Sequence, residues 1–149
     1  MVERVYGSVM MKEGIDYIGV GCGAFIINDK NQVLLIKRTD KCKNEAGKWN
    51  IPGGSIDYNE EVEKAVIREI KEELGVGIEN EKFMFYIDHI IPDEGQHWVS
   101  FIFKSRIKEG ELKIMEPHKH SELRWFDMDN LPEEQAISFQ LVMEKYKNA

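Results

Sequence analysis

Residues 54–76 read G-S-I-D-Y-N-E-E-V-E-K-A-V-I-R-E-I-K-E-E-L-G-V, and this stretch governs the interpretation of the rest of the chain. Apolar side chains recur in it every three or four residues: Val62, Ala65, Val66, Ile67, Ile70 and Leu74. That period predicts an amphipathic helix over residues 60–74 with one buried stripe. Asn59 is suited to cap the start of this helix, and Gly75 is suited to end it in a left-handed conformation.

Three carboxylates fall at the edge of the predicted stripe. Glu69, Glu72 and Glu73 are three and four residues apart, which places their Cβ atoms within about 5–6 Å of one another on a helix. Partly buried like charges at this distance repel by about 1–4 kcal/mol per pair. Arg68 can orient one or two of these acids, and Mg²⁺, which prefers oxygen ligands, suits the whole cluster. A solvated acidic face is the alternative, but the overlap with the apolar stripe favours a metal site.

Length and composition limit the class of protein. The chain has 149 residues and a net charge of −7, which predicts a single domain over residues 1–149 and argues against a nucleic-acid polymer as partner. The longest apolar stretch, residues 18–27, is about half the ~20 residues that cross a bilayer, and no signal peptide is evident. We expect Cys22 and Cys42 to be reduced thiols of a cytoplasmic protein without a membrane partner.

Most of the remaining segments have strand patterns. Residues 17–27 are rich in β-branched and aromatic side chains, with Gly19, Gly21 and Gly23 at alternate positions. This predicts a strand whose backbone something approaches closely. Further strands are predicted over residues 32–37, 82–91, 98–107, 112–115 and 123–126.

The connections complete the predicted architecture. Turn-forming residues at 28–31 predict a hairpin between the first two strands, and residues 39–48 are expected to form a mobile loop. A final helix is predicted from residue 131 to about residue 146. One central and one terminal helix among many strands indicate an α/β fold, with helices packed on the faces of a mixed sheet.

The acidic helix and its flanks carry a motif that resembles the Nudix box, G-x5-E-x7-R-E-U-x-E-E-x-G-U, in which U is aliphatic. Every defined position matches: Gly54, Glu60, Arg68, Glu69, Ile70, Glu72, Glu73, Gly75 and Val76. A softer resemblance extends to V-L-L-I-K-R, W-N-I-P-G-G and the late E-L-R-W-F-D followed by N-L-P.

This resemblance implies a fold and a chemistry. Nudix hydrolases are α/β/α sandwiches with a central mixed β-sheet and a loop–helix–loop that holds Mg²⁺ or Mn²⁺. They cleave a nucleoside diphosphate linked to a moiety X into a nucleoside monophosphate and P–X. By resemblance, the metal ligands are Glu69, Glu72, Glu73 and the carbonyl of Gly53. Arg68 resembles the cation that orients these glutamates, and Glu60 resembles a structural or outer-sphere group.

The sequence offers more than one candidate for the general base and two interpretations of the cations that could contact a substrate phosphate. In this family the base is a glutamate of the box or a carboxylate of a later loop. Glu69 is the first candidate, and Glu116 leads those outside the box, ahead of Asp93 and Glu94 in the 92–95 turn. Lys37 and Arg38 end a predicted strand, where they are expected to meet a substrate phosphate or to remain solvated edge cations.

Other polar and aromatic side chains have competing interpretations. His118 and His120 form an H-x-H pair that is more typical of a surface than of a metal site. Three aromatic residues are able to stack on a base, although strand aromatics are usually core: Trp49, Trp98 and Tyr86. Phe83, Met84 and Phe85 are expected to pack in the core.

The box indicates the chemistry rather than the moiety X. Later segments resemble the compact branch that converts a nucleoside triphosphate to a monophosphate and pyrophosphate, which is the expected activity. Pro92, 16 residues after Val76, resembles a marker of ADP-ribose pyrophosphatases, the second candidate. A non-catalytic nucleotide-binding Nudix domain is a third possibility. Many relatives are dimers, and the strand over residues 17–27 offers an edge for pairing with a second copy.

Overall fold

The computed structural model describes residues 4–6 and 9–148. Its elements, in chain order, are β1 (Arg4–Tyr6), β2 (Val9–Met11), β3 (Gly19–Ile26), β4 (Gln32–Arg38), β5 (Trp49–Asn50), β6 (Gly53–Ser55), α1 (Val62–Leu74), β7 (Gly77–Ile91), the 3-10 turn η1 (Pro92–Glu94), β8 (Gln96–Glu109), β9 (His120–Asp127) and α2 (Ile137–Lys147).

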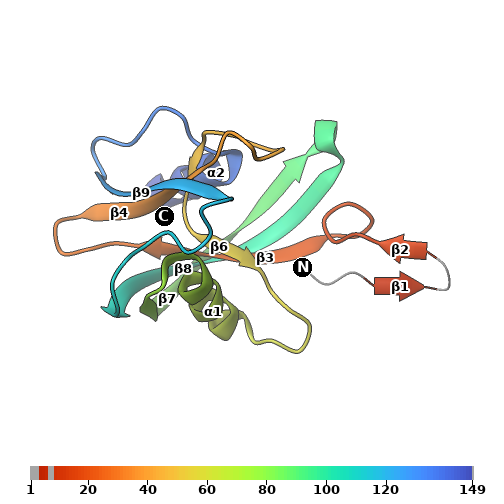
Figure 1. The fold of residues 1–149 in the computed structure, drawn as a ribbon, viewed down its shortest axis with the longest axis horizontal. Coiled ribbons are helices and arrows are strands. Elements are labelled where there is room, and N and C mark those ends of the chain that lie inside the picture. The colour runs from red at the N-terminus through yellow and green to blue at the C-terminus, as the bar shows by residue number, and fades with distance from the viewer. Residues whose placement is uncertain (1–3, 7–8, 149) are drawn as a thin grey trace.

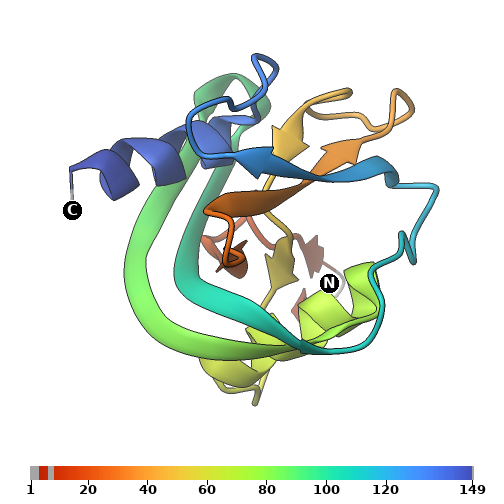
Figure 2. The ribbon, with the colours of Figure 1, turned by 90° about the vertical axis from the view of Figure 1, so that its left-hand side faces the viewer.

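Two sheets form the centre of the fold. A four-stranded mixed sheet has the order β6-β3-β8-β7, in which β3 runs parallel to β8 and antiparallel to β6. A three-stranded antiparallel sheet has the order β5-β4-β9. The strands lie between α1 and α2 (Figure 2), and the short β1–β2 hairpin projects from the body of the domain (Figure 1). This confirms the expected α/β/α architecture with a central mixed sheet.

The core is divided between the two helices. On one side Ala24 and Ile26 of β3 pack with Val66 and Ile70 of α1. On the other side Phe25 of β3 packs with the buried face of α2. Successive side chains of a strand point to opposite faces, so β3 supplies both halves of the core. Its nearly continuous apolar sequence follows from this burial on both faces.

The ends of α1 agree with the prediction at one terminus only. Gly75 takes the left-handed conformation with φ 73°, and its N–H donates to the carbonyl of Lys71 as expected. The predicted Asn59 cap is wrong, because Asn59 lies in a left-handed turn with φ 67° and the helix begins after Glu61. Ile67 was placed in the buried stripe but is 39% exposed.

Two predicted pairings of β3 are also wrong. The turn forms as expected, with Asn28 Oδ1 accepting from the N–H groups of Lys30 and Gln32. A single bridge between Ile27 and Val33 follows, and then β3 and β4 diverge into different sheets instead of continuing as a hairpin. Because β6 and β8 flank β3, this strand is not an edge that a second copy can pair with.

Tertiary pairing overrides two further predictions. Residues 112–115, all within the described part of the chain, form no strand. The final helix starts at Ile137 rather than at residue 131, because the preceding segment pairs with β5. Trp49 N–H donates to the carbonyl of Glu134, and the carbonyl of Trp49 accepts from Ala136.

Strand β7 is only partly a core strand. Met84 and Phe85 pack against the core on the α2 side, as expected. Phe83 is 50% exposed, which corrects the prediction that it is core. A register irregularity between Phe83 and Phe85 turns the Phe83 side chain to the other face, where its ring lies 5.5 Å from that of Phe103.

We predict that F139A destabilises the protein by about 3–5 kcal/mol, because Phe139 of α2 is completely buried and its loss leaves a cavity in the core. I137A, two residues earlier in the same helix, removes a side chain that is 40% exposed and should cost much less. Urea unfolding of both variants measures the difference. Equal destabilisation would contradict this account of the core.

Candidate active site

The first two residues of strand β6, Gly53 and Gly54, lie very close to the neighbouring β3 and α1. A Cβ atom added at Gly53 would lie 2.2 Å from the carbonyl oxygen of Cys22, and one added at Gly54 would lie 2.4 Å from Oε2 of Glu69. Gly53 N–H also donates to Oε1 of Glu73 at 2.8 Å. The two glycines therefore let the backbone press against α1 and hold two of its carboxylates in place.

Arg68 binds the outer acids of the helix. Its Nε and Nη2 donate to the two oxygens of Glu60 at 2.6 and 2.8 Å, and Nη1 donates to Glu69 at 3.0 Å and to Glu72 at 3.1 Å. Nη2 also donates to the carbonyl of Ser55 at 3.0 Å. The hydrogen bond to Arg68 lowers the pKa of Glu60. Of the three clustered acids Arg68 contacts two, Glu69 and Glu72, as expected, and it also pairs with Glu60 and with Asp57 at 3.6 Å.

Glu73 is buried out of reach of this network. Burial raises the pKa of its carboxyl to about 8, and the N–H of Gly53 opposes this rise. His120 Nε2 lies 3.4 Å from Oε2 of Glu73, and burial lowers the pKa of His120 to about 4. Without a metal, the two groups are therefore neutral at pH 7, as a protonated carboxyl beside an uncharged imidazole.

Glu116 completes a compact set of donors. Ligand atoms of Glu73, Glu116 and His120 all lie within 4.8 Å of one another. Nδ1 of His120 is buried and has no hydrogen-bond partner among the described residues. The two carboxylates fit a divalent cation such as Mg²⁺ or Mn²⁺, whereas an imidazole ligand suits Mn²⁺ and not Mg²⁺; the charge of either ion would favour an ionised Glu73. The surface interpretation therefore holds for the exposed His118 and is wrong for His120.

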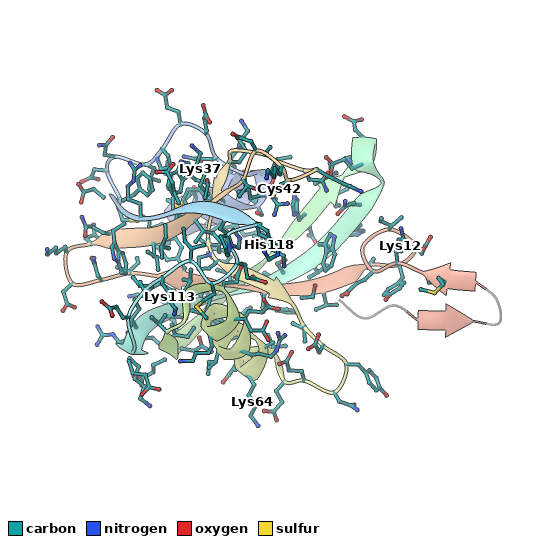
Figure 3. The ribbon with its side chains drawn as sticks, in the orientation of Figure 1. Lys12, Lys37, Cys42, Lys64, Lys113 and His118 are labelled. Carbon is teal, nitrogen blue, oxygen red and sulfur yellow. The ribbon has the colours of Figure 1, made fainter. Side chains whose placement is uncertain are left out.

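The other predicted site residues differ in their exposure and in their position relative to Glu73. Glu69 is 16% exposed and lies against Gly54, whereas Glu72 is 53% exposed. Burial raises the pKa of Glu69. The exposed Lys64 points away from the domain on the far side of α1 (Figure 3), which agrees with the predicted solvated face. Asp93 and Glu94 lie exposed in η1, apart from the Glu73 group.

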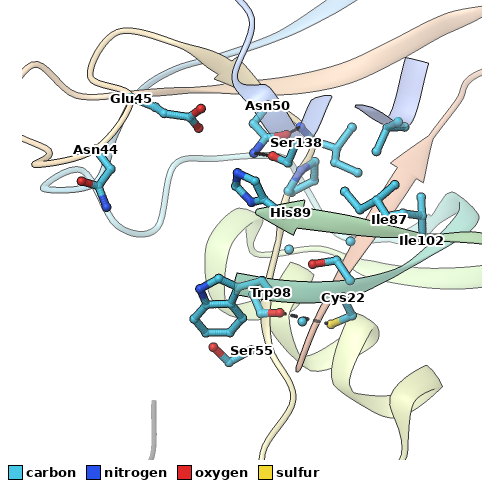
Figure 4. Close-up of a pocket in the computed structure, with 18 of the residues that line it drawn as sticks. Cys22, Asn44, Glu45, Asn50, Ser55, Ile87, His89, Trp98, Ile102 and Ser138 are labelled. Carbon is cyan, nitrogen blue, oxygen red and sulfur yellow. Dashed lines mark hydrogen bonds between the residues drawn. The ribbon is translucent and has the colours of Figure 1, made fainter. Parts of the chain in front are cut away.

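A cavity of about 340 Å³ (Figure 4) is lined in part by Gly53 and Gly54, the two glycines that contact Glu73 and Glu69. It extends from Gly53 and Gly54 to Trp98 and His89, between the four-stranded sheet and α2. Arg38 lines it and is held by a 2.8 Å hydrogen bond from Nε to the carbonyl of Asn44. Lys37 instead pairs with Glu122 at 3.4 Å and is not part of the lining. Only one of the two predicted phosphate contacts therefore reaches the cavity.

The NUDIX domain model matches residues 18–145 of this chain. The chain belongs to the Nudix family. It is 41% identical to a MutT NUDIX hydrolase from Burkholderia pseudomallei of known structure, with a TM-score of 0.81 over 87% of this chain and 98% of that one.

Relatives with named activities differ in substrate. The chain is 37% identical over 107 residues to an ADP-ribose pyrophosphatase from Methanocaldococcus jannaschii. The aligned region covers 72% of this chain and 61% of that protein. The chain is 28% identical over 141 residues to an RNA pyrophosphohydrolase from Pelagibacter ubique, covering 84% and 85% of the two chains. The region matched in a human 8-oxo-dGDP phosphatase is 36% of the length of that protein. Among the described residues, no helix is long and apolar enough to span a membrane.

We predict that E73Q changes how the stability of the metal-free protein depends on pH. Folded Glu73 keeps its proton up to about pH 8, whereas the unfolded carboxyl ionises near 4.5. Wild-type stability should therefore fall as the pH rises between these values, by at most about 1.4 kcal/mol per pH unit. Glutamine carries no such proton, so the stability of the variant relative to wild type should rise between pH 6.5 and 8. Unfolded His120 loses its proton near pH 6.5, and this titration is common to both proteins.

Urea unfolding in EDTA at several pH values measures this gain. E63Q, the same change at an exposed position of the same helix, serves as the control and should follow wild type. Parallel curves for wild type and E73Q would contradict the burial of a protonated Glu73.

Proposed function

We propose that this protein is a Mg²⁺- or Mn²⁺-dependent pyrophosphohydrolase that cleaves a nucleoside diphosphate linked to X. The observation that carries this proposal is the convergence of Glu73, Glu116 and His120 beside the acids of α1, next to a cavity. A buried carboxylate needs a compensating positive charge when it ionises, and a divalent cation supplies one.

The metal would be held by Glu69, Glu72 and Glu73 of the box, with Glu116 and the carbonyl of Gly53. When bound, it neutralises charge on the phosphate oxygens and lowers the pKa of a bound water. The protein's own residues then position the reactants. Arg68 fixes Glu69 and Glu72 by hydrogen bonds near 3 Å.

Two further roles follow from the geometry. Arg38 lines the cavity and is the candidate contact for a substrate phosphate, while Lys37 is engaged with Glu122. Glu69 is the first candidate for the general base, because burial raises the pKa of its carboxyl toward the range useful at neutral pH. Glu116 is the second candidate, since it lies in the same cluster.

A nucleoside triphosphate, converted to the monophosphate and pyrophosphate, is our first substrate candidate. The structural relative named MutT supports it, at 41% identity. ADP-ribose is the second candidate, and the 37% identity to the archaeal ADP-ribose pyrophosphatase supports it. Pro92 adds little to either, because it opens the exposed turn η1 between β7 and β8. The −7 charge argues against a nucleic-acid polymer as the natural substrate.

A substrate panel with Mg²⁺ tests the proposal directly. We expect hydrolysis of at least one of the NTPs, dNTPs, ADP-ribose, dinucleoside polyphosphates or a 5′-triphosphorylated RNA, with a nucleoside monophosphate or a monophosphate end as product. EDTA should abolish turnover and added Mg²⁺ should restore it, as product masses will report. Turnover that persists in EDTA would refute the metal mechanism.

We also predict that E69Q lowers kcat by about 100-fold or more, because it removes a buried carboxylate that contributes both charge and basicity. The fold should survive, since glutamine can accept the hydrogen bond from Arg68. E63Q makes the same change at an exposed position of α1 and should keep wild-type turnover. Near wild-type kcat in E69Q would remove Glu69 from the proposed machinery.

A further inference from the structure

Trp98 occupies a different environment from the other two tryptophans of the chain. Trp49 is buried in the core, with its ring 4.8 Å from that of Phe126. Trp125 packs against the core on the α1 side. Trp98 lies on the face of β8 that lines the cavity (Figure 4), so its ring is available to a molecule bound there.

The backbone holds the Trp98 ring at both ends. A Cβ atom added at Gly19 would lie 2.5 Å from Cε3 of the indole, and one added at Gly14 would lie 2.3 Å from Nε1. Nε1 donates to Oε1 of Gln96 at 3.1 Å, and the N–H of His97 donates to the carbonyl of Gly14 at 2.8 Å. The ring is therefore fixed before any ligand arrives, which lowers the entropic cost of binding.

The alternate glycines of β3 leave room for the side chains that line this part of the cavity. Gly19, Gly21 and Gly23 pair in register with Trp98, Ser100 and Ile102 of β8, and Gly21 and Gly23 line the cavity. Side chains of neighbouring elements cover these glycines: Trp98 covers Gly19, Ser100 covers Gly21, and Ile51 and Ile102 cover Gly23. The indole is the flat surface among them, and it suits a planar aromatic group.

His89 adds an unpaired polar atom beside the ring. It is the cross-strand partner of Trp98 on β7, and both side chains line the cavity. Its Nε2 is buried and has no hydrogen-bond partner among the described residues. Burial lowers the pKa of His89, so the imidazole is neutral at pH 7 and can exchange one hydrogen bond with the edge of a heterocycle.

We propose that Trp98 is the stacking surface for the heterocyclic base of the substrate and determines the preference for base-bearing over base-free phosphates. This inference rests on the proposed function for the identity of the ligand. The same cavity reaches Gly53 and Gly54, which lie against Glu73 and Glu69. A nucleotide stacked on Trp98 would therefore lie in the cavity whose glycines, Gly53 and Gly54, contact two of the acids proposed to hold the metal.

Binding of nucleoside monophosphates tests this role without requiring turnover. AMP, GMP, CMP and UMP are titrated calorimetrically into wild type with Mg²⁺, and ribose 5-phosphate serves as the probe that lacks a base. We expect W98L to weaken the tightest monophosphate by about 10-fold or more, as loss of base stacking typically does, and to leave ribose 5-phosphate unchanged. Y86L removes an exposed aromatic residue from the opposite face of the sheet and should bind all probes like wild type.

Tryptophan emission gives a second measurement if W98L does not fold. The monophosphate should quench the emission of wild type, and in W98F, which retains a stacking ring, binding should persist while most of this quenching disappears. The proposal is overturned if no monophosphate binds more tightly than ribose 5-phosphate. It is also overturned if W98L loses both probes equally or neither, or if W98F is quenched like wild type.

The two proposals can fail separately. Trp98-dependent binding of a monophosphate by a protein that hydrolyses no member of the substrate panel would overturn the proposed function alone. Metal-dependent hydrolysis with a base preference that W98L retains would overturn the role of Trp98 alone.

Discussion

The close approach of β6 to both β3 and α1 is the constraint on which the site depends. Only glycine fits at position 53, where an added Cβ would lie 2.2 Å from the carbonyl oxygen of Cys22, and a Cβ at position 54 would displace Glu69, whose Oε2 would lie 2.4 Å away. The backbone therefore replaces side chains as the packing surface for two carboxylates. The N–H of Gly53 gives Glu73 one hydrogen bond that burial would otherwise deny it.

The negative charges of the acids on and next to α1 are compensated in two ways, according to how deeply each carboxyl group is buried. Near the surface, the guanidinium of Arg68 pairs with Glu69 and Glu72 of α1 and with Glu60, which precedes the helix. Deeper in the protein, Glu73 has a neutral imidazole, one backbone N–H and a second carboxylate beside it but no ion pair with a charged side chain among the described residues, and a proton satisfies it in the absence of metal. A divalent cation would replace that proton, so metal binding at this site should release it.

Local patterns predicted α1 well, and long-range pairing explains most of what was missed. The spacing of apolar residues and glutamates is a property of one helix, so its position, its Gly75 end and the partly buried acids could be read from the sequence. His120 could not be recognised in this way. It starts β9 opposite a register irregularity between Lys37 and Arg38, so no strand alternation marks it as buried. The alternate glycines of β3 predicted a close approach but could not name Trp98 as the partner, because β8 lies some eighty residues away along the chain.

The two halves of the candidate site lie on different elements, and this separates the proposed chemistry from the proposed recognition. The carboxylates come from α1 and from the segment before β9, whereas the cavity wall comes from β3, β7 and β8. Strand β6 is the element that touches both halves, through Gly53 and Gly54. A change in the wall, such as another side chain in place of Trp98, can alter which base fits without moving an acid. The box can therefore match at every defined position even though relatives of this chain are named for different activities.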